Sequence, residues 1–155
     1  KTNKNMRLQV IALILALGLL GTLTHYSVAG NNMSKNESRL PKNSQEFLKK
    51  HFPNEKTSYV IVDKDGLQTT FEVMLTSGKE IEFYKNGEWK EIDAKKTAVP
   101  QTIIPANILK HVKDNFDNDV YVVQMEKKFW GIEVELSNKL EVEFTSGGKF
   151  LRYDN

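Results

Sequence analysis

Glutamates alternate with apolar residues in two segments of this 155-residue chain. Of the patterns in the sequence, this one is the best candidate for a chemical or binding role. If residues 71–83 and 132–144 are strands, successive side chains point to opposite faces. The glutamates then share one face, and the apolar residues face a core. Tyr84 and Phe129 have the parity of the glutamates. The candidate binding face comprises Glu72, Glu80, Glu82, Tyr84, Phe129, Glu133, Glu135, Glu141 and Glu143.

Two interpretations of this face stay open at the level of sequence. It could be the solvated side of an amphipathic sheet. It could instead be a surface for a basic partner, in which the acids attract and the two aromatic residues anchor. A hydrolase with paired carboxylates needs two acids across a cleft, and nothing in the pattern places them so.

The sequence lacks the motifs of common enzyme and metal sites. It has no glycine-rich phosphate loop, no nucleophile elbow and no His-Glu-x-x-His motif. It has no cysteine, which excludes disulfides, thiolate zinc sites and cysteine nucleophiles. We therefore expect a non-enzymatic protein without a cofactor, a metal or catalytic residues.

Histidine and tryptophan residues are the remaining candidates for a ligand site. His51 and His111 fall in predicted helices without neighbouring ligands, which favours a structural role over metal binding. Trp89 and Trp130 could anchor a ligand. Trp130 shares parity with Ile132, so we expect it to pack in the core.

The first 29 residues have the three-part pattern of a signal peptide. Residues 1–9 are basic, residues 10–23 are almost wholly apolar, and Ser27 and Ala29 suit a cleavage site. Fourteen apolar residues are short against the roughly 20 of a membrane-spanning helix. The pattern predicts export to the periplasm or beyond and cleavage near Ala29. An uncleaved anchor over residues 8–29 is the alternative.

Removal of this segment changes the charge balance. Three of the 22 Lys and Arg residues and none of the 20 Asp and Glu residues lie in it, so the remainder has a net charge of −1. Nucleic-acid binding needs a clustered basic surface and is not expected. Nor is a membrane contact expected after cleavage. Residues 30–39 are polar and are predicted to be a linker.

The rest of the chain repeats itself. Residues 40–52 (LPKNSQEFLKKHF) align with residues 104–116 (IPANILKHVKDNF), and both predict a helix. Four predicted strands follow each helix, over residues 57–62, 71–75, 79–83 and 86–91, and over residues 119–124, 132–136, 140–144 and 147–152. Short turns such as Asn86-Gly87 make neighbouring strands antiparallel. The predicted class is α+β, with repeats at 40–93 and 104–155 and a linker at 94–103. Each repeat is a helix plus a four-stranded antiparallel sheet, and the open edges allow the two sheets to join.

These motifs resemble a known family. In the first repeat they are Leu40-Pro41, His51-Phe52-Pro53, Glu72-Val73, Leu75, Gly78, Glu80 to Phe83, Asn86-Gly87 and Trp89; in the second they are Val99-Pro100, Ile104-Pro105, Gly131 to Val134 and Glu141 to Phe144. The pattern is similar to the PepSY-like, beta-lactamase-inhibitor-like family of exported Bacteroidetes proteins, over nearly all of residues 40–155. In the second repeat, Phe150 stands where the first has Trp89, so the resemblance does not imply one ligand site in both copies.

The resemblance implies a fold similar to beta-lactamase inhibitory protein and a role as a binding module or inhibitor. We expect an exported, non-enzymatic module that acts on a protein or peptide in the cell envelope. A structural or envelope-stress protein without a dedicated ligand is the alternative, and an enzyme of unrecognised type is a third hypothesis. Fold similarity does not imply inhibition of a beta-lactamase. The pattern leaves the identity of the partner and the oligomeric state open.

Overall fold

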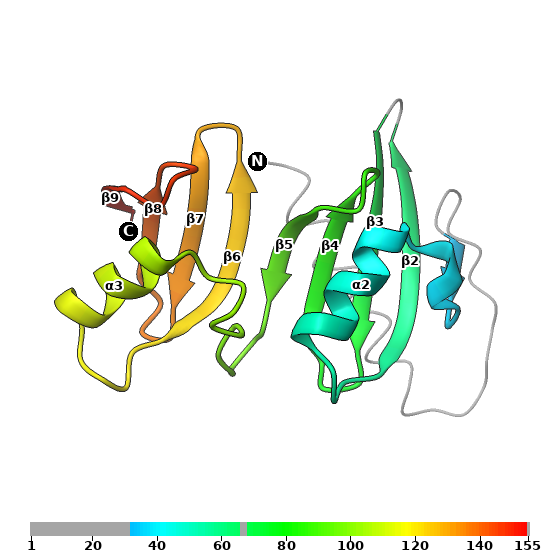
Figure 1. The fold of residues 1–155 in the computed structure, drawn as a ribbon, viewed down its shortest axis with the longest axis horizontal. Coiled ribbons are helices and arrows are strands. Elements are labelled where there is room, and N and C mark those ends of the chain that lie inside the picture. Colours follow the sequence, from blue (N-terminus) through cyan, green and yellow to red (C-terminus); the bar gives the residue numbers. More distant parts are fainter. Residues whose placement is uncertain (1–31, 66–67, 155) are drawn as a thin grey trace.

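All the described strands belong to one open antiparallel sheet, as Figure 1 shows. The computed structural model describes residues 32–65 and 68–154. Each strand pairs with its neighbour in the sequence. The strands are β1 (Asn32–Ser34), β2 (Thr57–Asp65), β3 (Gln68–Leu75), β4 (Glu80–Tyr84), β5 (Trp89–Asp93), β6 (Val122–Lys128), β7 (Gly131–Leu136), β8 (Glu141–Phe144) and β9 (Phe150–Asp154).

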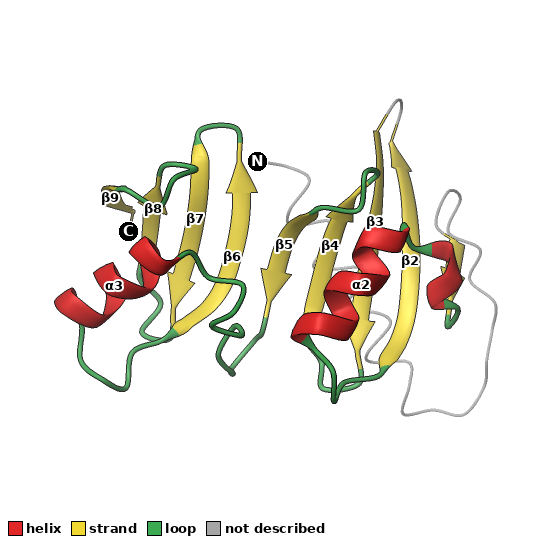
Figure 2. Cartoon of the chain, in the orientation of Figure 1, coloured by secondary structure: helices red, strands yellow, loops and turns green. Residues whose placement is uncertain are grey.

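Two helices cover one face of this sheet (Figure 2). Helix α2 (Lys42–His51) precedes β2, and helix α3 (Ala106–Asn115) precedes β6. A short 3-10 helix, η1 (Glu37–Arg39), lies before α2. Buried positions on the two long helices, including Leu48, Ile108 and Val112, point to the sheet. The opposite face, which we call the open face, carries no described helix.

The four-stranded sheets of the two predicted repeats are joined into one sheet, because β5 and β6 pair. Their register joins Glu91 to Glu126, Ile92 to Met125 and Asp93 to Gln124. This pairing satisfies backbone groups that two free edges would leave exposed. The result is a mixed α and β fold with one continuous sheet and one core.

The segments between and before the predicted repeats are more ordered than linkers. Ala94 and Val99, in the segment 94–103, are buried, and their N–H groups donate to the carbonyls of Val123 and Val122 at 2.8 and 2.9 Å. Residues 32–39, within the predicted 30–39 linker, contain β1 and η1. The predicted signal peptide, residues 1–29, lies outside the described residues. No helix among the described residues is long and apolar enough to cross a membrane.

A single hydrophobic core runs beneath both helices. Its fully buried side chains alternate along the strands with the residues of the open face. They include Val60, Val73, Ile81, Phe83, Ile92, Met125, Val134, Leu136, Val142 and Phe144, and Ile108 of α3 belongs to the same core. Apolar burial is the main force that holds the helices on the sheet. The sheet therefore presents a fixed register of side chains on its other face.

The start of each helix is tied to a hairpin turn of its own half. The Asn43 side chain donates to the Asn86 carbonyl at 3.3 Å, and the Asn107 side chain donates to the Gly147 carbonyl at 3.1 Å. Gly87 has φ +86°, and a Cβ there would lie 2.8 Å from the Cβ of Asn43. Only glycine suits both the left-handed backbone and the close helix. These ties fix the angle of each helix on the sheet.

Candidate functional site

The open face carries two parallel rows of acidic side chains that cross the sheet from strand to strand. Within each row, neighbours are directly opposite each other in the strand register. The first row runs Glu72, Glu82, Glu91, Glu126, Glu133, Glu143 and then Arg152. The second row runs Glu80, Asp93, Gln124, Glu135, Glu141 and Asp154. The rows cross the β5–β6 junction, so both halves of the chain build one surface.

Like charges directly opposite each other on neighbouring strands repel, since the strands are only about 4.8 Å apart. Basic side chains offset part of this repulsion. The ion pairs on this face are Lys90–Glu82 (2.8 Å), Lys95–Glu80 (3.1 Å), Lys95–Asp93 (2.7 Å), Lys128–Glu126 (2.5 Å), Lys128–Glu133 (3.3 Å), Lys139–Glu135 (2.9 Å) and Arg152–Glu143 (2.7 Å). These pairs join five cations to seven of the eleven carboxylates in the two rows. The rows themselves contain eleven carboxylates and one cation, Arg152, so they have a negative formal charge.

The cations of the face stay charged where they are partly buried. Burial alone would lower the pKa of Lys128, but hydrogen bonds and charges from Glu126 and Glu133 raise it. The pKa of Lys95 is raised in the same way, because its bonds to Asp93 and Glu80 outweigh burial. Both ammonium groups therefore stay charged around neutral pH.

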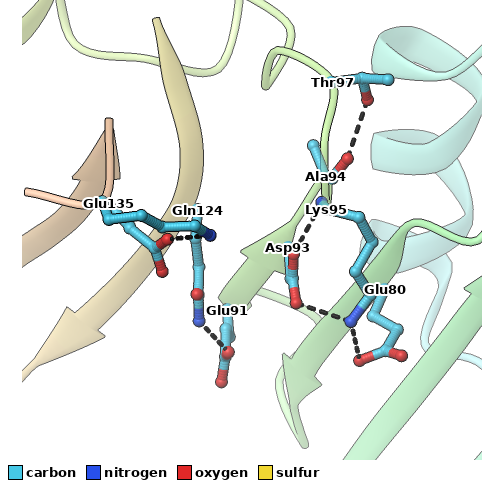
Figure 3. A network of polar contacts seen from close by, with 9 residues as sticks. Glu80, Glu91, Asp93, Ala94, Lys95, Thr97, Gln124 and Glu135 are labelled. Carbon is cyan, nitrogen blue, oxygen red and sulfur yellow. Dashed lines mark hydrogen bonds and ion pairs between the residues drawn. The ribbon is translucent and has the colours of Figure 1, made fainter. Parts of the chain in front are cut away.

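A polar network spans the junction of the two halves, and Figure 3 shows it. Across β5 and β6, the Gln124 side chain donates to Glu91 at 2.5 Å. Lys95, which follows β5, forms ion pairs with Glu80 of β4 and with Asp93 of β5. Of these contacts, the Gln124–Glu91 hydrogen bond crosses the junction, where β5 and β6 pair.

A shallow depression lies between the rows. Its lining is Gln124, Glu126, Glu133, Glu135 and Glu141. It has room for about one water molecule or a bare ion. An organic substrate could not be enclosed there. A flat acidic surface of this kind suits contact with another macromolecule more than with a small molecule.

The structure brings the seven predicted glutamates together on the open face. Tyr84 ends β4 on the same side and is half-buried. Phe129 lies at the end of this face and not on a strand, because β6 ends at Lys128 and β7 begins at Gly131. It occupies the two-residue turn between them and is fully exposed, at 101%. Trp130, expected in the core, shares this turn and is half-buried.

Several members of the rows were missed by the sequence analysis. They are Glu91, Asp93, Gln124, Glu126 and Asp154. Glu91 and Asp93 alternate around the buried Ile92, which is a usable signal. Glu126 was missed because the predicted strand 119–124 stops short of the observed end of β6. Gln124 lies within that predicted strand but is not acidic, so the pattern of glutamates did not include it. Correct strand ends would have extended the acidic pattern across the sheet.

At the β2 and β3 end, the open face becomes apolar. Ile61 lies opposite Glu72, Met74 lies opposite Glu80, and both are 5% exposed. The Tyr59 hydroxyl is buried and has no hydrogen-bond partner among the described residues. Burial, and then the charges of Glu72 and Glu80, raise the pKa of Tyr59 to about 12. This hydroxyl is neutral at physiological pH.

Comparison with known proteins identifies the family. The sequence model described as "Putative beta-lactamase-inhibitor-like, PepSY-like" matches residues 69–152, which is more than half of the chain. The chain belongs to this family. The matched region spans strands of both halves, so the family pattern includes the β5–β6 junction of this PepSY-like protein. No curated protein matches the chain.

Three solved structures from Bacteroides resemble this PepSY-like protein. A "putative periplasmic protein of unknown function" from Bacteroides vulgatus is 38% identical; the match covers 81% of this chain and all of that one, with a TM-score of 0.77. A "putative calcium-regulated periplasmic protein" from Bacteroides thetaiotaomicron is 35% identical, covering 81% and 97% of the two chains, with a TM-score of 0.76. A second B. vulgatus protein, also described as a "putative periplasmic protein", is 30% identical, covering 83% and 100%, with a TM-score of 0.76.

These relatives confirm two predictions about the PepSY-like protein. The family is the one that the sequence motifs indicated. The protein is exported, and its relatives are described as periplasmic.

In the PepSY-like protein, His51 is the last residue of α2, and His111 lies in the middle of α3. His111 stacks on Phe150 with ring centroids 4.6 Å apart, and its Nε2 is 3.3 Å from the Tyr153 hydroxyl. His51 Nδ1 is 2.9 Å from the Thr102 hydroxyl. No group of three or more His, Asp or Glu residues in the described ranges is arranged to hold a metal ion. The surroundings of both histidines are those of packing residues.

Stability of the PepSY-like protein is expected to fall as the pH drops below about 6.5. Burial lowers the pKa of both His51 and His111 from 6.5. Between the lowered values and 6.5, the unfolded chain binds more protons than the folded one. Their contribution is therefore complete above pH 6.5 and is lost as the pH falls through the folded pKa values. Melting curves at pH 7.5 and 5.5 measure it, and the double variant His51→Asn/His111→Asn should have the smaller pH dependence. An equal or larger dependence in the variant would contradict this assignment.

Proposed function

We propose that this PepSY-like protein is a non-enzymatic binding or inhibitor-like module of the cell envelope, and that its open face binds a basic protein or peptide. The observation that carries the proposal is the first row, in which six glutamates stand in register on six neighbouring strands. Opposed like charges weaken a sheet, so a fold with no use for them would place other residues there.

The charge of the open face supports a basic partner in particular. Rows of carboxylates attract cations from a distance and raise the rate of encounter. They also disfavour acidic partners, which gives selectivity. In this proposal Tyr84 and the fully exposed Phe129 supply aromatic contacts at the end of the face where β4 and β6 terminate. Aromatic residues commonly supply most of the energy of an interface.

We further propose that residues 40–93 and 104–155 are two repeats, joined by residues 94–103. Each has one helix followed by four strands. In each, an asparagine in the first turn of the helix donates to a carbonyl in the last hairpin turn, through Asn43 in one and Asn107 in the other. Joining two such units through β5 and β6 doubles the width of the acidic surface.

The alternative is an envelope protein without a dedicated ligand, whose open face is merely solvated. The ion pairs along the rows favour it, because they show that the chain offsets part of its own charge. The two functions differ in one measurable respect. A binding face loses its partner when its charge is removed, whereas a solvated face loses nothing.

A capture experiment tests the proposal. Immobilised residues 30–155 should retain a basic protein from the host envelope, and raised salt should release it. Glu133→Gln/Glu135→Gln should bind that protein about three- to thirtyfold more weakly, since partly exposed charges are each worth about 0.3–1 kcal/mol. Glu37→Gln/Glu46→Gln makes the same charge change at exposed positions outside the rows and is the matched control. Equal binding by both double variants would exclude the open face.

Calcium binding at the open face would change this proposal. The relative from B. thetaiotaomicron is described as calcium-regulated. The depression on the open face here is lined only by carboxylate and amide side chains, the ligand type that calcium prefers. Calorimetric titration with CaCl2 is the check. Saturable binding by the wild type that Glu133→Gln/Glu135→Gln abolishes would make the face an ion site instead of a protein-binding surface. Our proposal expects no saturable binding.

A further inference from the structure

Strand β9 forms one edge of the sheet, and it has the composition of an interaction surface. Among the described strands it pairs only with β8. Two of the four exposed large hydrophobic side chains of the described chain, Leu151 (46%) and Tyr153 (43%), lie on it. Alternate residues of an edge strand direct their N–H and C=O groups away from the sheet, where they can pair with another strand.

The side chains of β9 divide between the two faces of the sheet. Phe150 and Tyr153 lie on the helix-covered face, because both rings contact the ring of His111. The ring centroids are 4.6 and 6.1 Å from that of His111. Arg152 lies on the open face, where it bonds Glu143. Opposite residues in an antiparallel pair share a face. A second strand must therefore set an apolar or aromatic residue opposite Phe150 and Tyr153.

The β9 strand of a second copy, related to the first by a two-fold axis, meets this requirement. We propose that β9 pairs antiparallel with β9 of a second copy, with Phe150 of each chain opposite Tyr153 of the other. The same register sets Lys149 opposite Asp154, so opposite charges meet at both ends. A register centred on Arg152 would instead bring two guanidinium groups together. The observed order of residues is thus self-complementary, as a two-fold interface requires.

Neither Lys149 nor Asp154 is committed to an ion pair within the described chain. Both are exposed, and they flank β9 at its two ends. The other edge strand, β1, has only three residues and offers a shorter template. Pairing through β9 would join the two sheets and bring the acidic rows of two copies end to end. This assembly is independent of whether the open face binds a basic partner.

Sedimentation velocity tests the proposal by charge exchange. At about 0.5 mM, where a weak strand interface is occupied, residues 30–155 should sediment as a dimer. Lys149→Glu and Asp154→Lys should each be monomeric, because each sets like charges opposite each other. An equimolar mixture of the two variants should regain the dimer, since opposite charges meet again at both ends.

Two controls test whether the loss of the dimer is specific to β9. Lys85→Glu makes the same charge change in the exposed β4–β5 turn and should stay dimeric. Circular dichroism should show the same melting temperature for all variants, so that loss of the dimer is not loss of the fold. A monomeric wild type at this concentration overturns the proposal. Dimers that persist in both single variants, or a mixture that stays monomeric, overturn the register and with it the proposed edge.

Discussion

Replacing Gly131 by alanine is expected to cost about 3–5 kcal/mol in the free energy of unfolding, or to prevent folding. A Cβ at this position would lie 1.9 Å from the carbonyl oxygen of Phe144 and 2.9 Å from the Cα of Thr145. Both are backbone atoms, so no change of rotamer relieves the overlap. Gly131 begins β7, and β7 must move away from β8 to admit the methyl group. That movement opens the second half of the core.

Urea unfolding followed by circular dichroism measures this effect. Gly147→Ala is the matched control, because a Cβ there meets only the Thr145 hydroxyl at 3.9 Å. Its stability should lie within about 1 kcal/mol of the wild type, the usual range for alanine at a compatible position. An unchanged midpoint for Gly131→Ala would mean that the β7–β8 pairing differs from the one described.

Replacing Phe83 by alanine is expected to lower the free energy of unfolding by about 3–5 kcal/mol. The ring is fully buried and packs edge-on against Phe47 of α2, with ring centroids 5.6 Å apart. Its loss removes apolar contacts and leaves a cavity between α2 and the sheet. The surrounding strands are held by their ladders and can close only part of that cavity.

Phe129→Ala is the matched control. It removes the same ring from a fully exposed position, whereas Phe83 is fully buried. Phe129→Ala should change stability by less than about 0.5 kcal/mol. If Phe129 anchors the basic partner, its loss should weaken capture by up to about 2 kcal/mol. Thermal melts and the capture assay separate the two effects. Comparable destabilisation by both variants would show that Phe129 packs against the protein.

Much of the fold could be predicted from local sequence. The apolar positions of the two helices recur at helical spacing, and the turns at Asn86-Gly87 and Gly147-Gly148 mark hairpins. The alternation around Val73 and Val134 placed seven glutamates on one face, because the two-residue period of a strand is a local property. These features depend on residues a few positions apart, which a single sequence records directly.

The join between the halves depends on contacts that the alternation does not encode. Ile92 faces Met125 across β5 and β6, although 32 other residues separate them in the chain. Strand ends were equally hidden, because packing decides where a strand stops. Phe129 continued the alternation in the sequence, yet β6 ends at Lys128 and sends it into a turn.

The sequence by itself therefore determined the family, the helices, the turns and the acidic character of one face. Tertiary structure decided that this face is a single surface. The six glutamates of the first row align only when all the strands are paired in register, and that register is set by the shared core beneath the helices. Long-range pairing also decided which strand remains at the edge. Such pairing is a property of the whole sheet. The position of each strand depends on its neighbouring strands, which are separated from it in the chain by turns.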